Sequence, residues 1–388
     1  MIKRILYTLL IMFPVLASAQ INTDRVMAIG RNALYFEDYV LSIQYFNQVI
    51  NAKPYLSDPY FYRGLAKINL DDFQGAESDC SEAIERNPFV VSAYQVRGLA
   101  RIQQNNFAGA IEDYTKALEF DPENIGVWHN MALCRIRQED YKGAKNDLDK
   151  LIAISPRYTK AYLMRGEVDL KQKDTLAAEK DFGKAIEIDR YDADTWASRA
   201  ILRLQQQRYK DAEADLDHAI RLSTRNSGVY INRALARYHQ NNLRGAMSDY
   251  DIALDIDPNN FIGHYNRGLL RAQVGDDNRA IQDFNFVIEM EPDNMMAIFN
   301  RGLLLDQTGD YKGAIKDYST VINEYPNFLL GYQYRAQARR KIGDVKGADA
   351  DEFKVLKAQL DKQNGVDPNK QTADNTENNK TRKKSDKN

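Results

Sequence analysis

Residues 57–90 read SDPYFYRGLAKINLDDFQGAESDCSEAIERNPFV. Apolar residues recur in this stretch at steps of three and four, first from Tyr60 onward and again from Phe73 onward. This spacing is typical of an amphipathic helix, so the stretch predicts two helices. The acidic pair Asp71-Asp72 interrupts the pattern between them. We therefore expect a helical hairpin of 34 residues.

The same hairpin pattern recurs along nearly the whole chain at a constant spacing of 34 residues. We number each repeat so that a Gly or Ala stands at position 8; these residues are Gly30, Gly64, Gly98, Ala132, Gly166, Ala200, Ala234, Gly268, Gly302 and Ala336. A second small residue follows at position 20, and a proline stands at position 32 in seven repeats. Small residues at both places let two antiparallel helices approach closely. Ten repeats then cover residues 23–362, starting at residues 23, 57, 91, 125, 159, 193, 227, 261, 295 and 329.

Large residues stand at two further fixed positions. Position 4 is aromatic in seven repeats: Tyr60, Tyr94, Trp128, Tyr162, Trp196, Tyr230 and Tyr332. Position 24 is aromatic or leucine in eight: Phe46, Tyr114, Leu148, Phe182, Leu216, Tyr250, Phe284 and Tyr318. With these positions the chain resembles the tetratricopeptide repeat family. The resemblance implies an all-α, right-handed superhelical solenoid of about ten helix-turn-helix repeats, whose first helices line a concave groove.

A repeat array needs a polar outer face at its ends, because the terminal repeats have a neighbour on one side only. The last repeat agrees with this expectation, since Glu352 replaces the aromatic at position 24 and Leu360 replaces the proline. Residues 363–388 contain almost no apolar side chain. They cannot bury enough surface to fold, so we expect a disordered polar tail.

The first residues, 1–19, do not belong to the repeats. A positively charged start, an apolar run and small residues before Gln20 form the three parts of a secretory signal peptide,. The apolar run of twelve residues is too short to cross roughly 30 Å of hydrocarbon, so we expect no membrane span after cleavage,. This predicts an exported protein that works in the periplasm or cell envelope, or is secreted.

Composition argues against several classes of function. The 53 Lys and Arg residues nearly balance the 55 Asp and Glu residues, which disfavours nucleic acid as the main partner,. Two cysteines and four histidines leave little material for a metal site, and the histidines fall at different repeat positions,. Cys80 and Cys134 occupy core-type positions, which predicts buried thiols rather than a disulfide. We expect no catalytic residues, no bound metal and no cofactor.

One charge pair recurs with the repeat. Position 7 is arginine in eight repeats: Arg63, Arg97, Arg165, Arg199, Arg233, Arg267, Arg301 and Arg335. Position 23 is aspartate in nine: Asp79, Asp113, Asp147, Asp181, Asp215, Asp249, Asp283, Asp317 and Asp351. The favoured interpretation is an internal Arg–Asp ladder that fixes the helix register. The alternative is a basic stripe for phosphate or nucleic acid, which the matched acids and the export signal both weaken.

The family resemblance places positions 2, 5, 6, 9, 12 and 13 of each first helix in the groove. Position 6 is asparagine in four repeats: Asn130, Asn232, Asn266 and Asn300. An amide side chain can both donate to and accept from a peptide backbone, and related repeat proteins hold extended peptides with such a row. The neighbouring apolar residues would take the partner's side chains; they are Ile231, Leu235, Tyr265, Leu269, Phe299 and Leu303,. Alternatively, the asparagines only solvate the helix and adjacent repeats cover the leucines.

The sequence therefore favours a non-enzymatic scaffold that binds partner proteins or extended peptides in its groove. The carboxylate clamp of chaperone-tail binders needs Lys at position 5 and Asn at position 9, and no repeat has both. The second hypothesis is a carrier or sensor of glycan or cell-wall fragments, with Tyr35, Tyr265 and Phe299 as the rings for stacking. The sequence indicates neither the partner's identity nor the oligomeric state.

Overall fold

A computed structural model describes residues 22–363. Within this range all regular secondary structure is α-helical. Each repeat supplies a first helix, the A helix, and a second helix, the B helix. The A helices are α2 (Thr23–Tyr35), α4 (Asp58–Ile68), α6 (Val91–Gln103), α8 (Ile125–Arg137), α10 (Thr159–Lys171), α12 (Ala193–Gln205), α14 (Ser227–His239), α16 (Phe261–Gln273), α18 (Met295–Thr308) and α20 (Leu329–Lys341). The B helices are α3 (Tyr39–Ala52), α5 (Phe73–Arg86), α7 (Phe107–Phe120), α9 (Tyr141–Ile154), α11 (Thr175–Ile188), α13 (Tyr209–Leu222), α15 (Leu243–Ile256), α17 (Asp277–Met290), α19 (Tyr311–Glu324) and α21 (Val345–Gln363).

The all-α repeat architecture predicted from the sequence is confirmed. The predicted signal peptide of residues 1–19 lies outside the described residues, as does the predicted tail except for Gln363, which ends α21.

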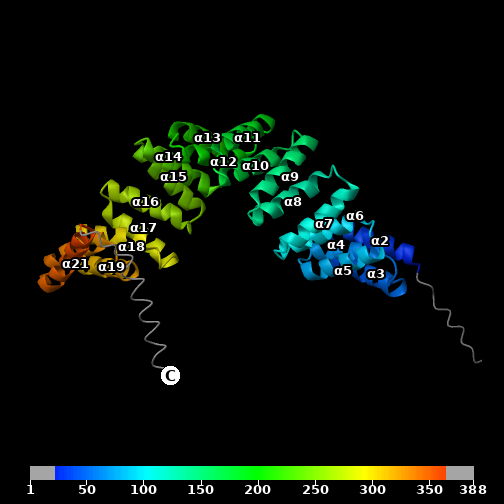
Figure 1. Cartoon of the computed structure of the whole chain (residues 1–388), viewed down its shortest axis with the longest axis horizontal. Coiled ribbons are helices and arrows are strands. Elements are labelled where there is room, and N and C mark those ends of the chain that lie inside the picture. Colours follow the sequence, from blue (N-terminus) through cyan, green and yellow to red (C-terminus); the bar gives the residue numbers. More distant parts are fainter. Residues whose placement is uncertain (1–21, 364–388) are drawn as a thin grey trace, which may run out of the picture. The chain divides into compact units, whose positions relative to one another are not determined.

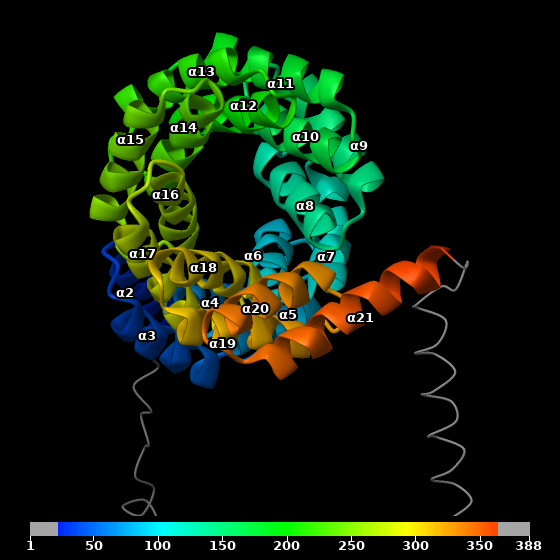
Figure 2. The same cartoon turned by 90° about the vertical axis from the view of Figure 1, so that its left-hand side faces the viewer.

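The described chain divides into two compact units. The N-terminal unit holds residues 22–190, with repeats 1–5, and the C-terminal unit holds residues 191–363, with repeats 6–10. Within each unit the A and B helices of a repeat pack together, and each B helix packs on the A helix that follows (Figure 1). In the C-terminal unit, α14 and α16 lie on the inner side of the stack, whereas α13 and α15 lie on its outer side (Figure 2).

The turn between the two helices of a repeat has the same backbone shape in all ten. The residue at position 15 is left-handed every time, with φ from 58° at Asp71 to 92° at Gly309. The next residue caps the B helix in most repeats; the Asp72 carboxylate, for example, accepts from the Gly75 amide at 2.9 Å. A left-handed residue followed by an N-cap stops one helix and starts another. This is the physical basis of the acidic break seen in the sequence.

In several repeats the small residue at position 8 packs directly against a large one at position 24. A Cβ atom added to Gly166 would lie 2.6 Å from Cε1 of Phe182, closer than packed atoms tolerate. Where the residue at position 8 is Ala132, the partner at position 24 is the smaller Leu148. Both partners are buried in each case. The two positions therefore set the distance between the helices of a repeat.

The Arg–Asp pairs form an internal ladder, as the favoured interpretation predicted. Asp249 is 1% exposed and accepts from Arg233 Nε at 3.0 Å, Arg233 Nη2 at 2.6 Å and Arg237 Nη1 at 2.8 Å. Arg233 Nη1 also reaches back to Asp217 of the preceding repeat, at 2.7 Å. The alternative of an exposed basic stripe is wrong for these arginines, because buried carboxylates already hold their guanidinium groups.

The same backward reach recurs in the ladder and joins neighbouring repeats. In six other repeats the position-7 arginine donates to position 25 of the repeat before it; the pairs are Arg63–Asn47, Arg97–Ser81, Arg165–Asp149, Arg267–Asp251, Arg301–Asn285 and Arg335–Ser319. Each of these arginines therefore bonds both its own repeat and the one before. We call this contact the inter-repeat joint.

Repeat 4 departs from the ladder, because the buried Met131 stands where other repeats have arginine. The buried Asp147 then has Arg135 as its partner, with Nε and Oδ2 2.7 Å apart but not aligned for a hydrogen bond. Burial raises the pKa of Asp147 to about 6, and the Arg135 charge only partly opposes this,.

The last repeat is less polar on its outer face than expected. Glu352 at position 24 is exposed and pairs with Arg340, as predicted for an end. Phe353, Leu356 and Leu360 on the same helix, however, are also exposed. Elsewhere the next A helix covers the aliphatic residue that corresponds to Leu356, and no further repeat follows α21 within the described residues.

Candidate functional site: the A-helix face of the C-terminal unit

We use the name A-helix face for the surface formed by the exposed and half-buried residues at positions 2, 5, 6 and 9 of α14, α16, α18 and α20. Most of the apolar residues predicted for the groove contribute to it. Leu269 is exposed, while Leu235, Tyr265, Phe299 and Leu303 are half-buried.

Two of the predicted site residues do not join this surface. Ile231 is 7% exposed and belongs to the core beside Gly263, so it offers almost no surface to a partner. Asn130 lies on α8 in the N-terminal unit. The structure therefore gathers three of the four predicted asparagines on one face.

These three asparagines are not equivalent. Asn300 donates from Nδ2 to the Tyr265 hydroxyl oxygen at 3.1 Å, so this amide nitrogen is engaged within the protein. Asn232 and Asn266 are half-buried, and within residues 22–363 neither side chain has a hydrogen-bond partner. A half-buried amide without a partner retains its full capacity to donate and accept. Asn232 and Asn266 are therefore the polar groups best placed for a ligand.

Tyr265 carries a polar group of its own onto the face. Burial raises the pKa of its hydroxyl, so the proton stays on at neutral pH,. Because the hydroxyl oxygen accepts from Asn300, its hydrogen remains free to bond an acceptor such as a peptide carbonyl,. The ring itself packs edge-on against Phe284, with the centroids 5.8 Å apart.

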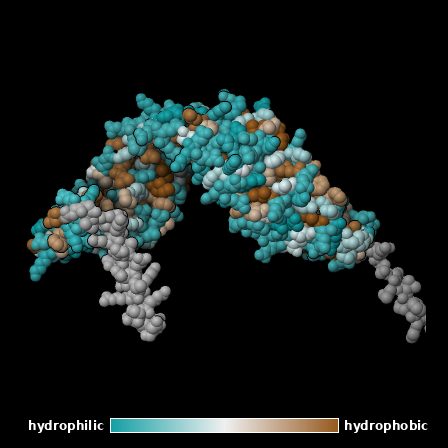
Figure 3. All heavy atoms as spheres, viewed as in Figure 1, coloured by the Kyte–Doolittle hydropathy of each residue, from teal (hydrophilic) through white to brown (hydrophobic). Residues whose placement is uncertain are grey.

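The sequence analysis missed a row of exposed apolar residues at position 2. Ile262, Met296 and Leu330 are 50%, 63% and 50% exposed, and they occupy this position in three consecutive repeats. The signal was present in the sequence, because position 2 of the first seven repeats holds only Asp, Ser, Gly or Lys. Figure 3 shows hydrophobic residues gathered over this part of the C-terminal unit.

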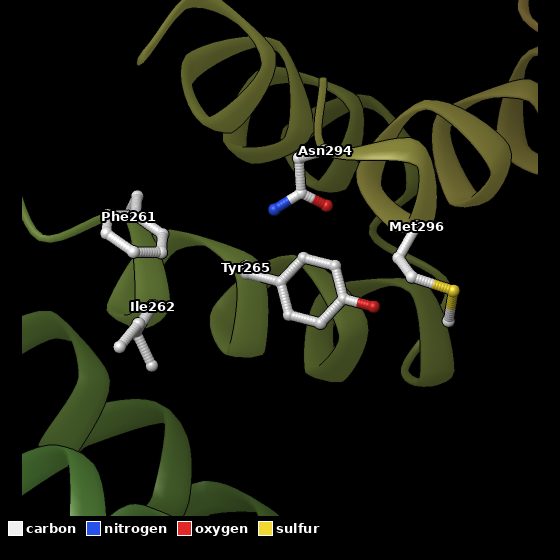
Figure 4. A pocket seen from close by; sticks show the side chains of 5 residues that line it. All are labelled: Phe261, Ile262, Tyr265, Asn294 and Met296. Carbon is white, nitrogen blue, oxygen red and sulfur yellow. The ribbon is translucent and has the colours of Figure 1, made fainter. Parts of the chain in front are cut away.

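A pocket opens on the face between α16 and the start of α18. Its volume is about 250 Å³, and its lining residues are Phe261, Ile262, Tyr265, Asn294 and Met296. Figure 4 shows the Tyr265 ring extending from α16 toward Met296, with Asn294 beside the ring. The Asn294 amide is already bonded, since Oδ1 accepts from the Ala297 amide and Nδ2 donates to Glu291. The pocket is therefore lined mainly by apolar side chains, and no charged residue lines it.

The face carries no formal charge. Positions 2, 5, 6 and 9 of repeats 7–10 include no Asp, Glu, Lys or Arg. The same positions in the N-terminal unit include Asp24, Arg31, Asp58, Lys160 and Glu167. The two units thus differ in the chemistry they present.

The cysteines and histidines of the described residues lie apart from one another. Cys80 and Cys134 are free and buried, as predicted, and burial raises their thiol pKa values to about 12 and about 11. Three of the four histidines stack on separate rings, and His129 meets the Tyr158 ring edge-on. No group of three or more His, Cys, Asp or Glu side chains is placed to hold a metal ion within residues 22–363.

No helix in the described part of the chain is long and apolar enough to cross a bilayer.

Stacked helical hairpins joined by a periodic ladder define an all-α repeat solenoid. Comparison with known families gives the same result. Tetratricopeptide repeat profiles match residues 125–158, 159–192, 198–261 and 265–327, and a further TPR repeat profile matches residues 98–134. The chain belongs to the tetratricopeptide repeat family.

Solved structures show similar folds at low sequence identity. A tetratricopeptide repeat protein from Parabacteroides merdae is 20% identical with a TM-score of 0.51, and the match covers 64% of this chain and 98% of that one. The C-terminal part of a TPR repeat-containing protein from Cytophaga hutchinsonii is 17% identical with a TM-score of 0.50, covering 61% and 97%. No curated protein matches the chain. At these identities the likeness concerns the fold alone.

Proposed function

We propose that the protein is a non-enzymatic interaction scaffold of the cell envelope that holds a partner's extended segment on the A-helix face of the C-terminal unit. One observation carries the proposal: Asn232 and Asn266 lack hydrogen-bond partners beside the exposed apolar Leu269. An amide can pair with the backbone of an extended chain whatever its sequence, and apolar neighbours can bury its side chains.

The glycan hypothesis receives less support. Phe299, one of its predicted stacking rings, already packs against the rings of Tyr318, Phe328 and Tyr334. Tyr35 is exposed but lies in the other unit, on α2. A sugar-stacking site needs a free ring face with polar groups around it, and these positions do not combine the two.

The location in the envelope rests on the predicted signal peptide. If it is removed, the mature protein begins at Gln20 and fractionates with the envelope or the medium. Intact-mass measurement of the purified protein together with cell fractionation checks both points. A cytoplasmic chain that retains Met1 or residues 2–19 contradicts this part of the proposal.

The binding proposal is tested by in-cell crosslinking followed by mass spectrometry of what co-purifies. Three tagged forms are compared: wild type, the double variant Asn232→Ala with Asn266→Ala, and the control Asn278→Ala, which changes an exposed asparagine of α17. We expect one envelope protein to be recovered with wild type and control and to be lost with the double variant. Circular dichroism establishes that the double variant is folded.

A second variant strengthens the test. Leu269→Glu places a charge on the exposed apolar part of the face and should also abolish recovery. If recovery survives both the asparagine changes and Leu269→Glu, the partner does not bind on the A-helix face and the proposal fails.

A further inference from the structure

Building on the proposed function, we infer that the A-helix face selects uncharged extended peptide segments that carry one bulky aliphatic or aromatic side chain, which enters the pocket between α16 and α18. The inference names the chemistry of the partner segment. It depends on three observations: the absence of charge, the size of the pocket, and the arrangement of the free polar groups.

Because the face is uncharged, it disfavours charged residues in the bound segment. A charged side chain laid on this face would lose water without meeting an opposite charge at positions 2, 5, 6 or 9 of repeats 7–10,. Charged residues stand at groove positions 12 and 13 of repeats 9 and 10, and each is in an ion pair: Asp306 with Lys341, and Arg340 with Asp349 and Glu352. Glu291 accepts a hydrogen bond from Asn294. Selection against Asp, Glu, Lys and Arg follows from desolvation alone.

The volume of the pocket determines which side chain of the segment it can admit. An apolar cavity of roughly 150 Å³ is enough to hold a benzene ring. The pocket of about 250 Å³ therefore admits a leucine, methionine or phenylalanine side chain. Ile262 and Met296, which form its rim, are largely exposed and would be covered by the same segment.

The polar groups determine how the segment lies. Asn232 and Asn266 follow one another at position 6 of α14 and α16, and the free hydroxyl hydrogen of Tyr265 stands at position 5 of α16. Two amides and a hydroxyl can pair with separate backbone groups along an extended segment without contacting its side chains. Hydrogen bonds to its backbone then hold the segment, and the pocket recognises a single side chain.

A second pocket, in the N-terminal unit, has a different character. A pocket of about 610 Å³ lies there against the ladder, and its lining includes Arg97, Arg101, Glu112, Asp113 and Lys116. Its two arginines pair with Asp113 and its lysine pairs with Glu119. This pocket does not share the inferred selectivity and serves as an internal contrast.

The test is to pan a displayed library of random nonapeptides on the purified mature chain. We expect the enriched sequences to lack Asp, Glu, Lys and Arg and to share one Leu, Met or Phe. A capped synthetic copy of an enriched peptide should lose affinity by about tenfold to a hundredfold when that residue becomes alanine, the amount expected for one buried side chain. Replacement by aspartate should cost at least as much.

Variants of the protein test whether the peptide binds at the pocket. Met296→Glu puts a charge on an exposed part of its rim and should reduce affinity at least tenfold, whereas Leu176→Glu, an exposed leucine of α11, should leave affinity unchanged. Ile262→Ser provides a second rim variant that adds no charge.

Each outcome has a definite meaning. Enriched peptides that are charged, yet still require Met296 and Asn232, overturn the selectivity while leaving the proposed function standing. Enriched peptides whose binding ignores both the rim variants and the asparagine variants overturn both proposals. A library that yields nothing above the bare support overturns the selectivity, and in-cell crosslinking then decides the proposed function separately.

Discussion

At the scale of single residues, the ladder shows how the number of donors decides the charge state of a buried aspartate. Asp283 accepts from Arg267, Arg271 and His264, and although burial alone would raise its pKa, these hydrogen bonds and charges lower it. Asp147 sits at the same position of repeat 4 with Arg135 alone, and its pKa is raised by burial. Asp147 has neither a position-7 arginine nor a histidine as a partner, and the direction of the pKa shift is reversed.

This contrast predicts a pH dependence at repeat 4. The folded-state pKa of Asp147, about 6, is above the usual 3.8, so folding favours the protonated form,. Its unfavourable contribution is absent below about pH 3, grows between pH 4 and 6 and is complete above about 7. Asp147→Asn should therefore match wild type near pH 3 and be more stable at pH 7, by on the order of 3 kcal/mol. Urea unfolding at several pH values measures the difference.

Asp283→Asn is the matched control and should behave in the opposite way. Because the pKa of Asp283 is lowered, its ionised form stabilises the fold above the usual pKa and this contribution is lost on acidification,. The variant should be less stable than wild type at pH 7. Equal pH profiles for the two variants would contradict the account of the ladder.

Removing a ladder carboxylate altogether should be costly. Breaking a buried pair costs roughly 3–5 kcal/mol, and we expect Asp249→Ala near the lower end because Arg233 and Arg237 keep Asp217 and Glu213 as partners,. Asp255→Ala, an exposed change on the same helix α15, should cost less than about 0.5 kcal/mol,. Thermal or urea unfolding of both variants tests this, and equal losses would refute the buried ladder.

At the scale of helices, the repeat period predicted nearly everything that local chemistry controls. The helices, the turn at Asp71-Asp72 and the ladder all follow from residue type at a fixed position. The orientation of Asn300 toward Tyr265 and the burial of Ile231 did not follow, because both depend on contacts between repeats. Position 2 could have been found from the sequence, since only three repeats are apolar there.

The turn geometry predicts opposite effects for two glycines. A Cβ would meet nothing within 4 Å at either Gly183 or Gly275, but Gly183 lies inside α11 whereas Gly275 has φ of +81°. Gly183→Ala should stabilise by about 0.5–1 kcal/mol, because glycine is a poor helix former. Gly275→Ala should destabilise by about 1–2 kcal/mol, because an L side chain is strained in the left-handed region. Equilibrium unfolding of the pair tests the prediction, and equal signs would contradict it.

At the scale of the whole molecule, the two units each contain their own core. The buried clusters of the N-terminal unit lie within residues 50–168, and those of the C-terminal unit lie within residues 196–338. Repeat proteins draw their stability from each repeat and its immediate neighbours. Either unit therefore contains what it needs to fold.

We predict that residues 20–190 and residues 191–388, produced separately, are each helical and unfold cooperatively. Circular dichroism and calorimetry measure this. A fragment that is unfolded on its own at 25 °C would show that the two cores depend on one another.

The inter-repeat joint has a consequence for how such a chain can change length. Most repeats carry the arginine donor at position 7 and the acceptor at position 25. Such a repeat therefore donates to the repeat before it and accepts from the repeat after it. When a 34-residue segment is duplicated or deleted in phase, the repeats on the two sides of the change again present a position-7 donor to a position-25 acceptor. The inter-repeat joint therefore forms without a new interface. The array is thus modular, because whole repeats can be added or removed. Repeats can be added as spacers while the A-helix face of α14–α20 is left untouched.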